Sequence, residues 1–203
     1  EQGIDAVTEV PTDRWDIEQY YDPDPDVPGK MYTRYGSFLS EVDQFDATFF
    51  KISPREAKSL DPQHRLLLEV CWESLEDAGV SPLSLKGTQT GVFIGMMTHD
   101  YGQLAGQAVD VHTGSGNGAP LAAGRIAYTL GLSGPTLTVE TACSSSLVAC
   151  HLACQSLRNQ ESRLALVGGV NLMLTPGMSV LEAQAQMNSP DGRCKTFDDS
   201  ADG

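Results

Sequence analysis

The residue best placed to do chemistry is a cysteine in a turn between a predicted strand and a predicted helix. Thr136–Glu140 is short and rich in β-branched residues, which predicts a strand. Leu147–Leu157 is apolar or small on nearly every face, which is typical of a helix enclosed by the rest of a fold. Cys143 lies in the polar turn between them. The pattern therefore places a thiol at or just before the N-terminus of a buried helix.

A thiol at the start of a helix is favoured in its ionised form. Unpaired N–H groups and the positive end of the helix dipole stabilise an anion there, and the thiolate is the nucleophilic form of cysteine. The dipole contributes about 1 kcal/mol, or about 2 kcal/mol when the group is partly buried. We therefore expect Cys143 to be partly activated, with full activation requiring a histidine or another cation beside it. An inert, buried cysteine is the alternative interpretation of the same pattern.

A second apolar run completes a supersecondary unit around this cysteine. Arg163–Val167 is followed by two glycines and predicts another strand. Two apolar strands joined through a helix form a βαβ unit, whose parallel strands need a covering layer on both faces. The fold class expected from this unit is α/β.

Further elements are marked by capping and turn residues. Ser53 and Asp61 are each followed by proline, a combination that predicts the start of a helix. Gly91–Gly95 predicts a short buried strand, and Pro120–Leu130 predicts a helix. Arg125, in the middle of that last helix, is expected to be a structural cation with an acidic or carbonyl partner.

Four stretches of the chain resemble one known family. Val139–Ala149 resembles the active-site segment of the β-ketoacyl synthase (ketosynthase) domains of type I modular polyketide synthases. Asp61–Glu69, Gly124–Pro135 and Ser189–Asp198 match the same family and occur in the family's order. The likeness covers the whole chain, which is identified on these motifs as a member of that family.

The resemblance implies a fold, a reaction and a set of partners. The fold is a thiolase-like layered α/β/α/β/α fold, of which the chain covers roughly the N-terminal half. Cys143 would carry the acyl chain as a thioester, and the reaction is polyketide chain elongation by decarboxylative Claisen condensation with a malonyl-type extender. The extender arrives on an acyl carrier protein that bears phosphopantetheine, so no cofactor is expected in this domain itself. A neighbouring acyltransferase domain and a second copy of the complete domain, forming a homodimer, are the other expected partners.

The family's catalytic histidines are not found in this sequence. The resemblance implies two of them, in His-Gly-Thr-Gly-Thr and Asn-Ile-Gly-His contexts, and neither context occurs here. His151 lies eight residues after Cys143, about 12 Å along the same helix, too far to act as its base. We therefore expect residues 1–203 to be a partial ketosynthase domain that lacks the first strand and the C-terminal half with the histidine motifs. On its own, this part is expected not to catalyse condensation. His64 is expected to be exposed in the first turn of its helix.

Composition and charge exclude several other classes of protein. A net charge of −14 argues against nucleic acid and against an anionic membrane surface as partners. A hydrophobic content of 40% is typical of a globular protein rather than a disordered one. No apolar run is long enough to span a bilayer, no signal peptide is seen, and the five cysteines are an odd number. A reducing cytoplasm is therefore the expected location.

The cysteine pattern does not predict a metal site. Cys143, Cys150 and Cys154 fall on one helical face, but a step of seven residues rises about 10 Å, too far for one ion to bridge. No CxxC pair or histidine cluster completes a site for Cys150 and Cys154. These two cysteines are expected to pack in the core.

Two other functions are left open by the residues. The chain is a non-catalytic, ketosynthase-like scaffold domain if the cysteine has lost its catalytic partners. Gly114–Ala119 also fits the G-x-G-x-x-A form of a dinucleotide-binding loop, which would indicate an oxidoreductase. The residues before it, Ala108–His112, make a poor core strand, which argues against that second alternative.

Overall fold

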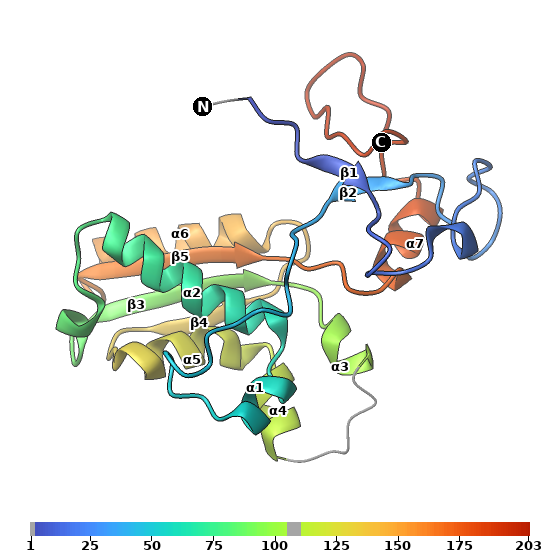
Figure 1. Cartoon of the computed structure of the whole chain (residues 1–203). Coiled ribbons are helices and arrows are strands. Elements are labelled where there is room, and N and C mark those ends of the chain that lie inside the picture. The colour runs from blue at the N-terminus through green and yellow to red at the C-terminus, as the bar shows by residue number, and fades with distance from the viewer. Residues whose placement is uncertain (1–2, 105–110) are drawn as a thin grey trace. The chain divides into compact units, whose positions relative to one another are not determined.

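A computed structural model shows the fold of the chain (Figure 1). It describes residues 3–104 and 111–203. The chain forms two compact units. The central unit is Glu41–Asn171, and the terminal unit combines residues 3–40 with Leu172–Gly203.

A parallel three-stranded sheet forms the middle of the central unit. Its strands are β3 (Thr90–Met96), β4 (Thr136–Val139) and β5 (Leu164–Val170), in the order β4-β3-β5. Every residue of β3 is buried, as its apolar run predicts. The two strands of the predicted βαβ unit, β4 and β5, run parallel to each other, as predicted. However, β3 lies between the two strands of that unit, so the connection from β4 to β5 crosses over β3.

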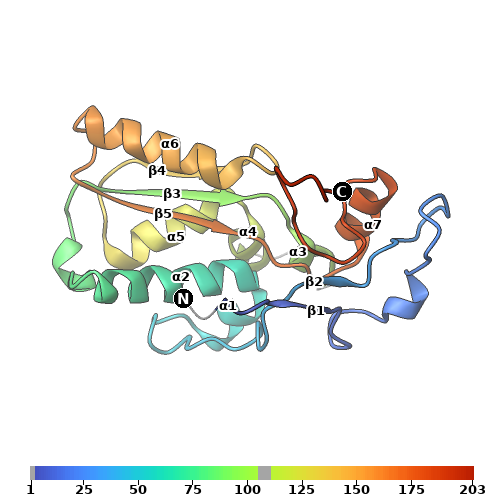
Figure 2. The ribbon, with the colours of Figure 1, turned by 90° about the horizontal axis from the view of Figure 1, so that it is seen from above.

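Helices cover both faces of this sheet (Figure 2). α6 (Ser145–Arg158) packs on one face, and α2 (Pro62–Asp77) and α5 (Pro120–Leu130) pack on the other. On the α6 face the helix contributes the small buried side chains Ala149 and Ala153, which pack with Phe93 of β3. The opposite face is filled by larger ones, among them Leu67, Leu68, Ile94, Ile126 and Leu130. Because its inner residues are short, α6 can lie close to the strands.

Capping residues begin the helices where the sequence predicts. The Ser53 hydroxyl accepts a hydrogen bond from the N–H of Glu56 (3.2 Å) at the start of α1 (Pro54–Ser59). The Asp61 carboxylate accepts one from the N–H of Gln63 (2.8 Å) at the start of α2. An N-cap of this kind contributes about 1 kcal/mol. Two short segments, η2 (Pro82–Leu85) and α3 (Asp100–Leu104), flank β3 along the chain.

Arg125 has both kinds of partner that its position predicts. Its Nη1 forms an ion pair with the Glu56 carboxylate (2.7 Å), and its Nη2 donates to the carbonyl oxygen of Ser115 (3.3 Å). The Arg125 side chain is only 14% exposed. One buried guanidinium therefore joins α5 to α1 and to the helix that contains Ser115.

That helix, α4 (Val111–Asn117), shows that the dinucleotide-binding hypothesis is wrong. Gly114 and Gly116 lie inside it rather than in a loop. A methyl group at Gly116 would lie 2.2 Å from the carbonyl oxygen of Ser59, so glycine is required because α4 packs directly on the chain between α1 and α2. Most of the preceding stretch, residues 108–110, lies outside the described residues.

The terminal unit has a small core of its own. β1 (Val7–Glu9) pairs antiparallel with β2 (Tyr35–Ser37), and the unit also holds η1 (Ile17–Gln19) and α7 (Gly177–Gln184). The buried hydrophobic residues of this core are Val10, Trp15, Ile17, Met31 and Ala183. Among the described residues of both units, no helix is long and apolar enough to cross a bilayer.

His64 corrects one expectation from the sequence. The first-turn pattern predicts an exposed histidine, but His64 is 1% exposed because α5 packs on α2. Burial lowers the pKa of His64 from 6.5 to about 4, and the charges of Arg125 and His99 act in the same direction. His64 is therefore neutral at physiological pH, and folding disfavours its protonation.

The depressed pKa of His64 predicts acid sensitivity. The unfolded chain binds this proton below pH 6.5 and the folded chain only near pH 4, so the contribution to stability is complete above pH 6.5 and is lost as the pH falls toward 4. At about 1.4 kcal/mol per pKa unit the loss reaches about 3 kcal/mol. Asp61 opposes it, because burial raises the pKa of that carboxyl.

We expect His64→Gln, in the intact protein that contains this chain, to flatten the fall in unfolding free energy between about pH 7.5 and pH 5.5. His151→Gln, which changes an exposed histidine on α6, is the control and should leave the pH profile unchanged. Chemical denaturation at each pH provides the measurement. An unchanged profile in His64→Gln would contradict the assignment.

Candidate active site

Cys143 lies at the tip of the turn between β4 and α6. The turn is tied by two serine hydroxyls. Ser145 Oγ accepts from the N–H of Thr141 (2.9 Å) and donates to the carbonyl oxygen of Ala142 (2.6 Å), and Ser144 Oγ donates to the carbonyl oxygen of Thr141 (2.8 Å). Ala142 adopts a left-handed backbone conformation, with φ of 53°. This conformation costs about 1–2 kcal/mol for a residue with a side chain, so the surrounding packing must hold the turn in place.

The helix start next to Cys143 is open to a ligand. Ser144 is the N-cap of α6 and makes no side-chain capping hydrogen bond. The first N–H groups of a helix lack partners within the helix. Here no cap side chain takes them, and the N–H of Ser145 donates to the carbonyl oxygen of Ala142 in the turn (3.0 Å). Cys143 itself is exposed. A developing oxyanion at this position would lie beside the N-terminus of a helix fourteen residues long.

Two glycines let the first turn of α6 rest directly on the sheet. A methyl group at Gly95 of β3 would lie 2.6 Å from the backbone nitrogen of Ser146 and 2.8 Å from its Cα. A methyl at Gly169 of β5 would lie 2.7 Å from the Cβ of Ser146. No side chain fits at either place without moving the helix. The backbone of β3 and β5 therefore fixes the distance between the sheet and the first turn of α6. It thereby also fixes the position of the Cys143 turn.

The ends of the three strands bring further polar groups to the same edge of the sheet. In a parallel sheet, ligands bind beyond the carboxyl ends of the strands. Thr98 follows β3, Cys143 follows β4 and Asn171 follows β5. Thr98 Oγ1 donates to Asn171 Oδ1 (2.7 Å). Thr98 and Asn171 were not predicted as site residues, although a polar residue one or two positions after a strand is the signal that would have indicated them.

Only one face of α6 is buried within the central unit. Ser145, Ala149, Ala153 and Ser156 face the sheet. Leu147 is 75% exposed, and Cys150 is exposed as well. The expectations of a helix enclosed on all sides and of Cys150 in the core are therefore not met within the described residues. No described residue of this unit covers the outer face.

The other thiols differ from Cys143 in their surroundings. Cys71 is buried in α2, and burial raises its pKa to about 11. Cys194 is exposed in the terminal unit, where hydrogen bonds from the side chain and backbone of Thr196 lower its pKa. Cys154 is half-buried. Among the described residues no group of three histidine, cysteine or acidic side chains is arranged to hold a metal ion.

Histidines are not paired with Cys143 in the described part of the chain. His64 and His99 interact electrostatically with each other near the start of α2. His151 is exposed on α6, about two turns beyond Cys143. No hydrogen bond joins the Cys143 sulfur to a histidine among the described residues. Within the described residues the site therefore combines an exposed thiol with the N-terminus of α6, and no histidine is bonded to that thiol.

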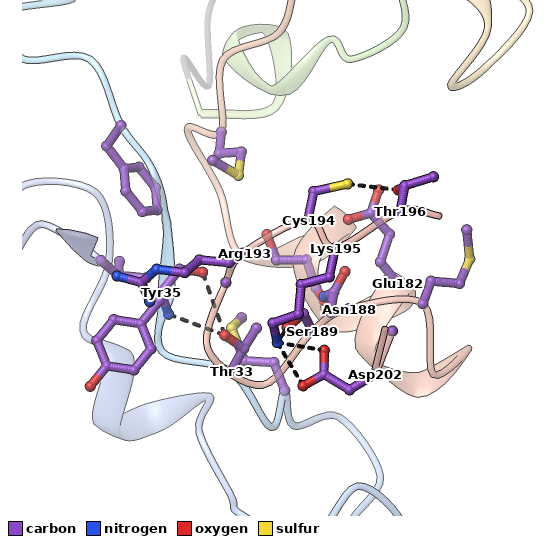
Figure 3. A pocket seen from close by; sticks show the side chains of 18 of the residues that line it. Thr33, Tyr35, Glu182, Asn188, Ser189, Arg193, Cys194, Lys195, Thr196 and Asp202 are labelled. Carbon is purple, nitrogen blue, oxygen red and sulfur yellow. Dashed lines mark hydrogen bonds and ion pairs between the residues drawn. The ribbon is translucent and has the colours of Figure 1, made fainter. Parts of the chain in front are cut away.

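The terminal unit contains a pocket of about 300 Å³ that the sequence did not predict (Figure 3). Its apolar lining includes Trp15, Met31 and Phe38. On the polar side, Lys195 Nζ bonds to the Asp202 carboxylate (2.7 Å), as Figure 3 shows. Burial raises the pKa of Glu182, another lining residue.

The structure places Cys143 at the carboxyl edge of a parallel sheet, at the start of the helix that covers one face of it. Comparison with known proteins gives the family. The family model described as "Beta-ketoacyl synthase, N-terminal domain" matches residues 1–203. The chain therefore belongs to the β-ketoacyl synthase family.

Relatives place the chain among polyketide synthases. It is 54% identical over 208 residues to one component of the phenolphthiocerol/phthiocerol polyketide synthase of Mycobacterium tuberculosis, a match that covers 99% of this chain and 10% of that protein. It is 53% identical to another component of the same synthase, covering 99% of the chain and 11% of the relative. The chain thus spans about a tenth of these large synthase proteins.

Solved structures confirm the fold. The oxazolomycin ketosynthase domain of Streptomyces albus JA3453 superposes with a TM-score of 0.87 at 41% identity, covering 97% of this chain and 35% of that one. The ketosynthase from module 6 of the bacillaene synthase of Bacillus subtilis 168 gives a TM-score of 0.84 at 42% identity, with coverages of 98% and 32%. The predicted thiolase-like α/β fold is confirmed, and the chain spans about a third of these ketosynthase chains.

The packing at Gly95 predicts a coupled loss of stability and thiol reactivity. Gly95→Ala forces the first turn of α6 away from β3, and overpacking of this kind costs about 1–3 kcal/mol. The displaced turn should also slow alkylation of Cys143. Gly124→Ala in α5 is the matched control, because nothing lies within 4 Å of the added methyl, and it should be neutral or stabilising by about 0.5–1 kcal/mol. Equal effects of the two substitutions on unfolding and on alkylation would contradict this packing.

The surroundings of the five cysteines predict an order of labelling. Brief treatment of the intact protein with limiting iodoacetamide, followed by peptide mapping, should label Cys143 first. Cys194 is the competing thiol, because it is also exposed and Thr196 lowers its pKa. Cys71 should be labelled last, since its pKa is raised to about 11 by burial. Even labelling of all five cysteines would contradict the prediction.

Proposed function

We propose that the chain is the nucleophile-bearing part of a ketosynthase that elongates polyketide chains, with Cys143 as the residue that carries the acyl chain. The observation that carries the proposal is the exposed Cys143 thiol at the uncapped start of α6. Membership of the β-ketoacyl synthase family supports it.

The proposed reaction has two covalent steps. The Cys143 thiolate attacks the carbonyl carbon of an acyl thioester, the carrier thiolate leaves, and the acyl chain stays on Cys143 as a thioester. A malonyl-type thioester on an acyl carrier protein then loses CO₂, and the resulting enolate carbon attacks the acyl-cysteine carbonyl. A carbon–carbon bond forms and the Cys143 thiolate leaves, which restores the free enzyme.

The start of α6 has a role in both steps. Each attack places negative charge on a carbonyl oxygen, and N–H groups at a helix start, with the N–H of Cys143 as one candidate, are suited to stabilise it. Loss of one such donor typically lowers the rate by about 10²–10³. The chain therefore contributes the nucleophile, Cys143, at a fixed position beyond the sheet. It also contributes the N–H donors at the start of α6 beside that cysteine.

The remaining parts of the machinery are proposed to lie elsewhere in the protein. The two family histidines that assist decarboxylation and condensation are expected outside residues 1–203, because no histidine is bonded to Cys143 among the described residues. The length of the solved ketosynthases, about three times the matched region, supports this. An acyl carrier protein bearing phosphopantetheine, a neighbouring acyltransferase domain and a second copy of the complete domain are the proposed partners. The five free cysteines favour a reducing, cytoplasmic setting.

The test compares two cysteine variants of the intact protein. With an acyl thioester and a malonyl-loaded carrier protein, mass spectrometry of the carrier should show a β-ketoacyl product for the unmodified protein. Cys143→Ala should abolish this product, whereas Cys150→Ala, which changes an exposed cysteine on the same helix, should retain it. Residues 1–203 alone should give none.

Each other outcome has a definite meaning. Condensation by Cys143→Ala would show that another residue carries the chain. Absence of product from the unmodified protein, with the carrier correctly loaded, would favour the non-catalytic scaffold.

A further inference from the structure

Several buried polar atoms of the central unit have no hydrogen-bond partner among the described residues. His64 is 1% exposed, and both of its ring nitrogens lack a hydrogen-bond partner among the described residues. The same holds for three other buried atoms, His99 Nδ1, Asn117 Oδ1 and Arg125 Nε. Buried polar groups in folded proteins are nearly always hydrogen-bonded, to protein or to ordered water. Four side chains with unmet hydrogen bonds therefore need a common explanation.

These side chains converge on the start of α2. The N–H of Asp61 donates to the carbonyl oxygen of Gly116 (2.9 Å), and Asn117 Nδ2 donates to the carbonyl oxygen of Ser59 (3.0 Å). The end of α4 is thereby fixed against the junction of α1 and α2. His64 lies in the next turn of α2 and interacts electrostatically with both Arg125 and His99. The unpartnered atoms come from α2, α4, α5 and the loop after β3, and α2, α4 and α5 contact one another near the start of α2.

The hydrogen-bonding chemistry of these atoms indicates which kind of ligand could bind to them. A neutral imidazole offers one donor and one acceptor, an amide oxygen only accepts, and a guanidinium N–H only donates. An anion would need donors alone, and a metal ion would need lone pairs alone. Arg125 is also already paired with the Glu56 carboxylate (2.7 Å), so little uncompensated positive charge is available for an anion. A mixture of donors and acceptors fits water, which typically makes about three hydrogen bonds when it is buried.

We propose that the start of α2 contains an internal hydration site, in which one or two ordered water molecules bond to His64 and to at least one of His99, Asn117 and Arg125. The water takes the place of protein partners for the neutral imidazole and joins α2 to α4 and α5 through hydrogen bonds. It serves as a structural ligand of the helical layer on the face of the sheet opposite α6.

A crystal structure of the intact protein at neutral pH and high resolution tests the site directly. We expect density for an ordered water within hydrogen-bonding distance of a His64 nitrogen and of a second atom of the set. A dry region, or one filled by an ion or by another part of the protein, would overturn the proposal.

Thermal unfolding of two variants gives an independent measurement. His64→Phe removes both nitrogens while keeping a ring, so loss of the water should lower the melting temperature by several degrees. His151→Phe changes an exposed histidine on α6 and should have little effect. If the region is dry, Phe relieves two unsatisfied nitrogens, and a melting temperature that is unchanged or raised in His64→Phe would overturn the proposal.

Discussion

The candidate site depends on one contact, in which the first turn of α6 rests on the bare backbone of β3 and β5. At Gly95 an added methyl would come within 2.6 Å of a backbone nitrogen, and at Gly169 within 2.7 Å of Ser146. Backbone atoms cannot move aside as a flexible side chain can. The strands therefore set where α6 begins, and the strained Ala142 conformation follows from joining β4 to a helix at that height. Cys143 is exposed because it lies at the tip of this short connection.

The two faces of the sheet are built differently. The α6 face carries the candidate site, and the opposite face carries most of the large apolar residues of the core. On the α6 face the helix buries its two inner alanines against Phe93 of β3, and its N-terminus holds the Cys143 turn at the carboxyl edge of the strands. The opposite face uses leucine and isoleucine, together with a polar region around His64 and Arg125. Membership of the β-ketoacyl synthase family gives the first face its proposed role in acyl transfer. The second face holds the sheet against its helical layer.

Local signals in the sequence were sufficient for several elements, among them the strands and helix around Cys143, but not for α4, β1 or β2. Ser53 and Asp61 predicted helix starts correctly, because an N-cap is a property of a few neighbouring residues. His64, Cys150 and Gly116 were misjudged for the opposite reason. Their surroundings depend on which helix covers them: α5 buries His64, nothing described in the central unit covers Cys150, and α4 needs Gly116 to approach the α1–α2 junction. The strand order β4-β3-β5 could not be predicted from local sequence patterns either. β3 lies between β4 and β5 in the sheet, although it comes much earlier in the chain than both.

The central claim is that the start of α6 presents Cys143, and no neighbouring thiol, to an acyl donor. Tryptic digestion of the intact protein after brief exposure to an acyl thioester tests it most directly. Cleavage after Arg125 and Arg158 releases residues 126–158 as one peptide that holds Cys143, Cys150 and Cys154 together. Fragmentation of that peptide should place the added acyl mass on Cys143 alone. An acyl group on Cys150 or Cys154, or an unmodified peptide while acyl groups accumulate elsewhere in the protein, would contradict the account.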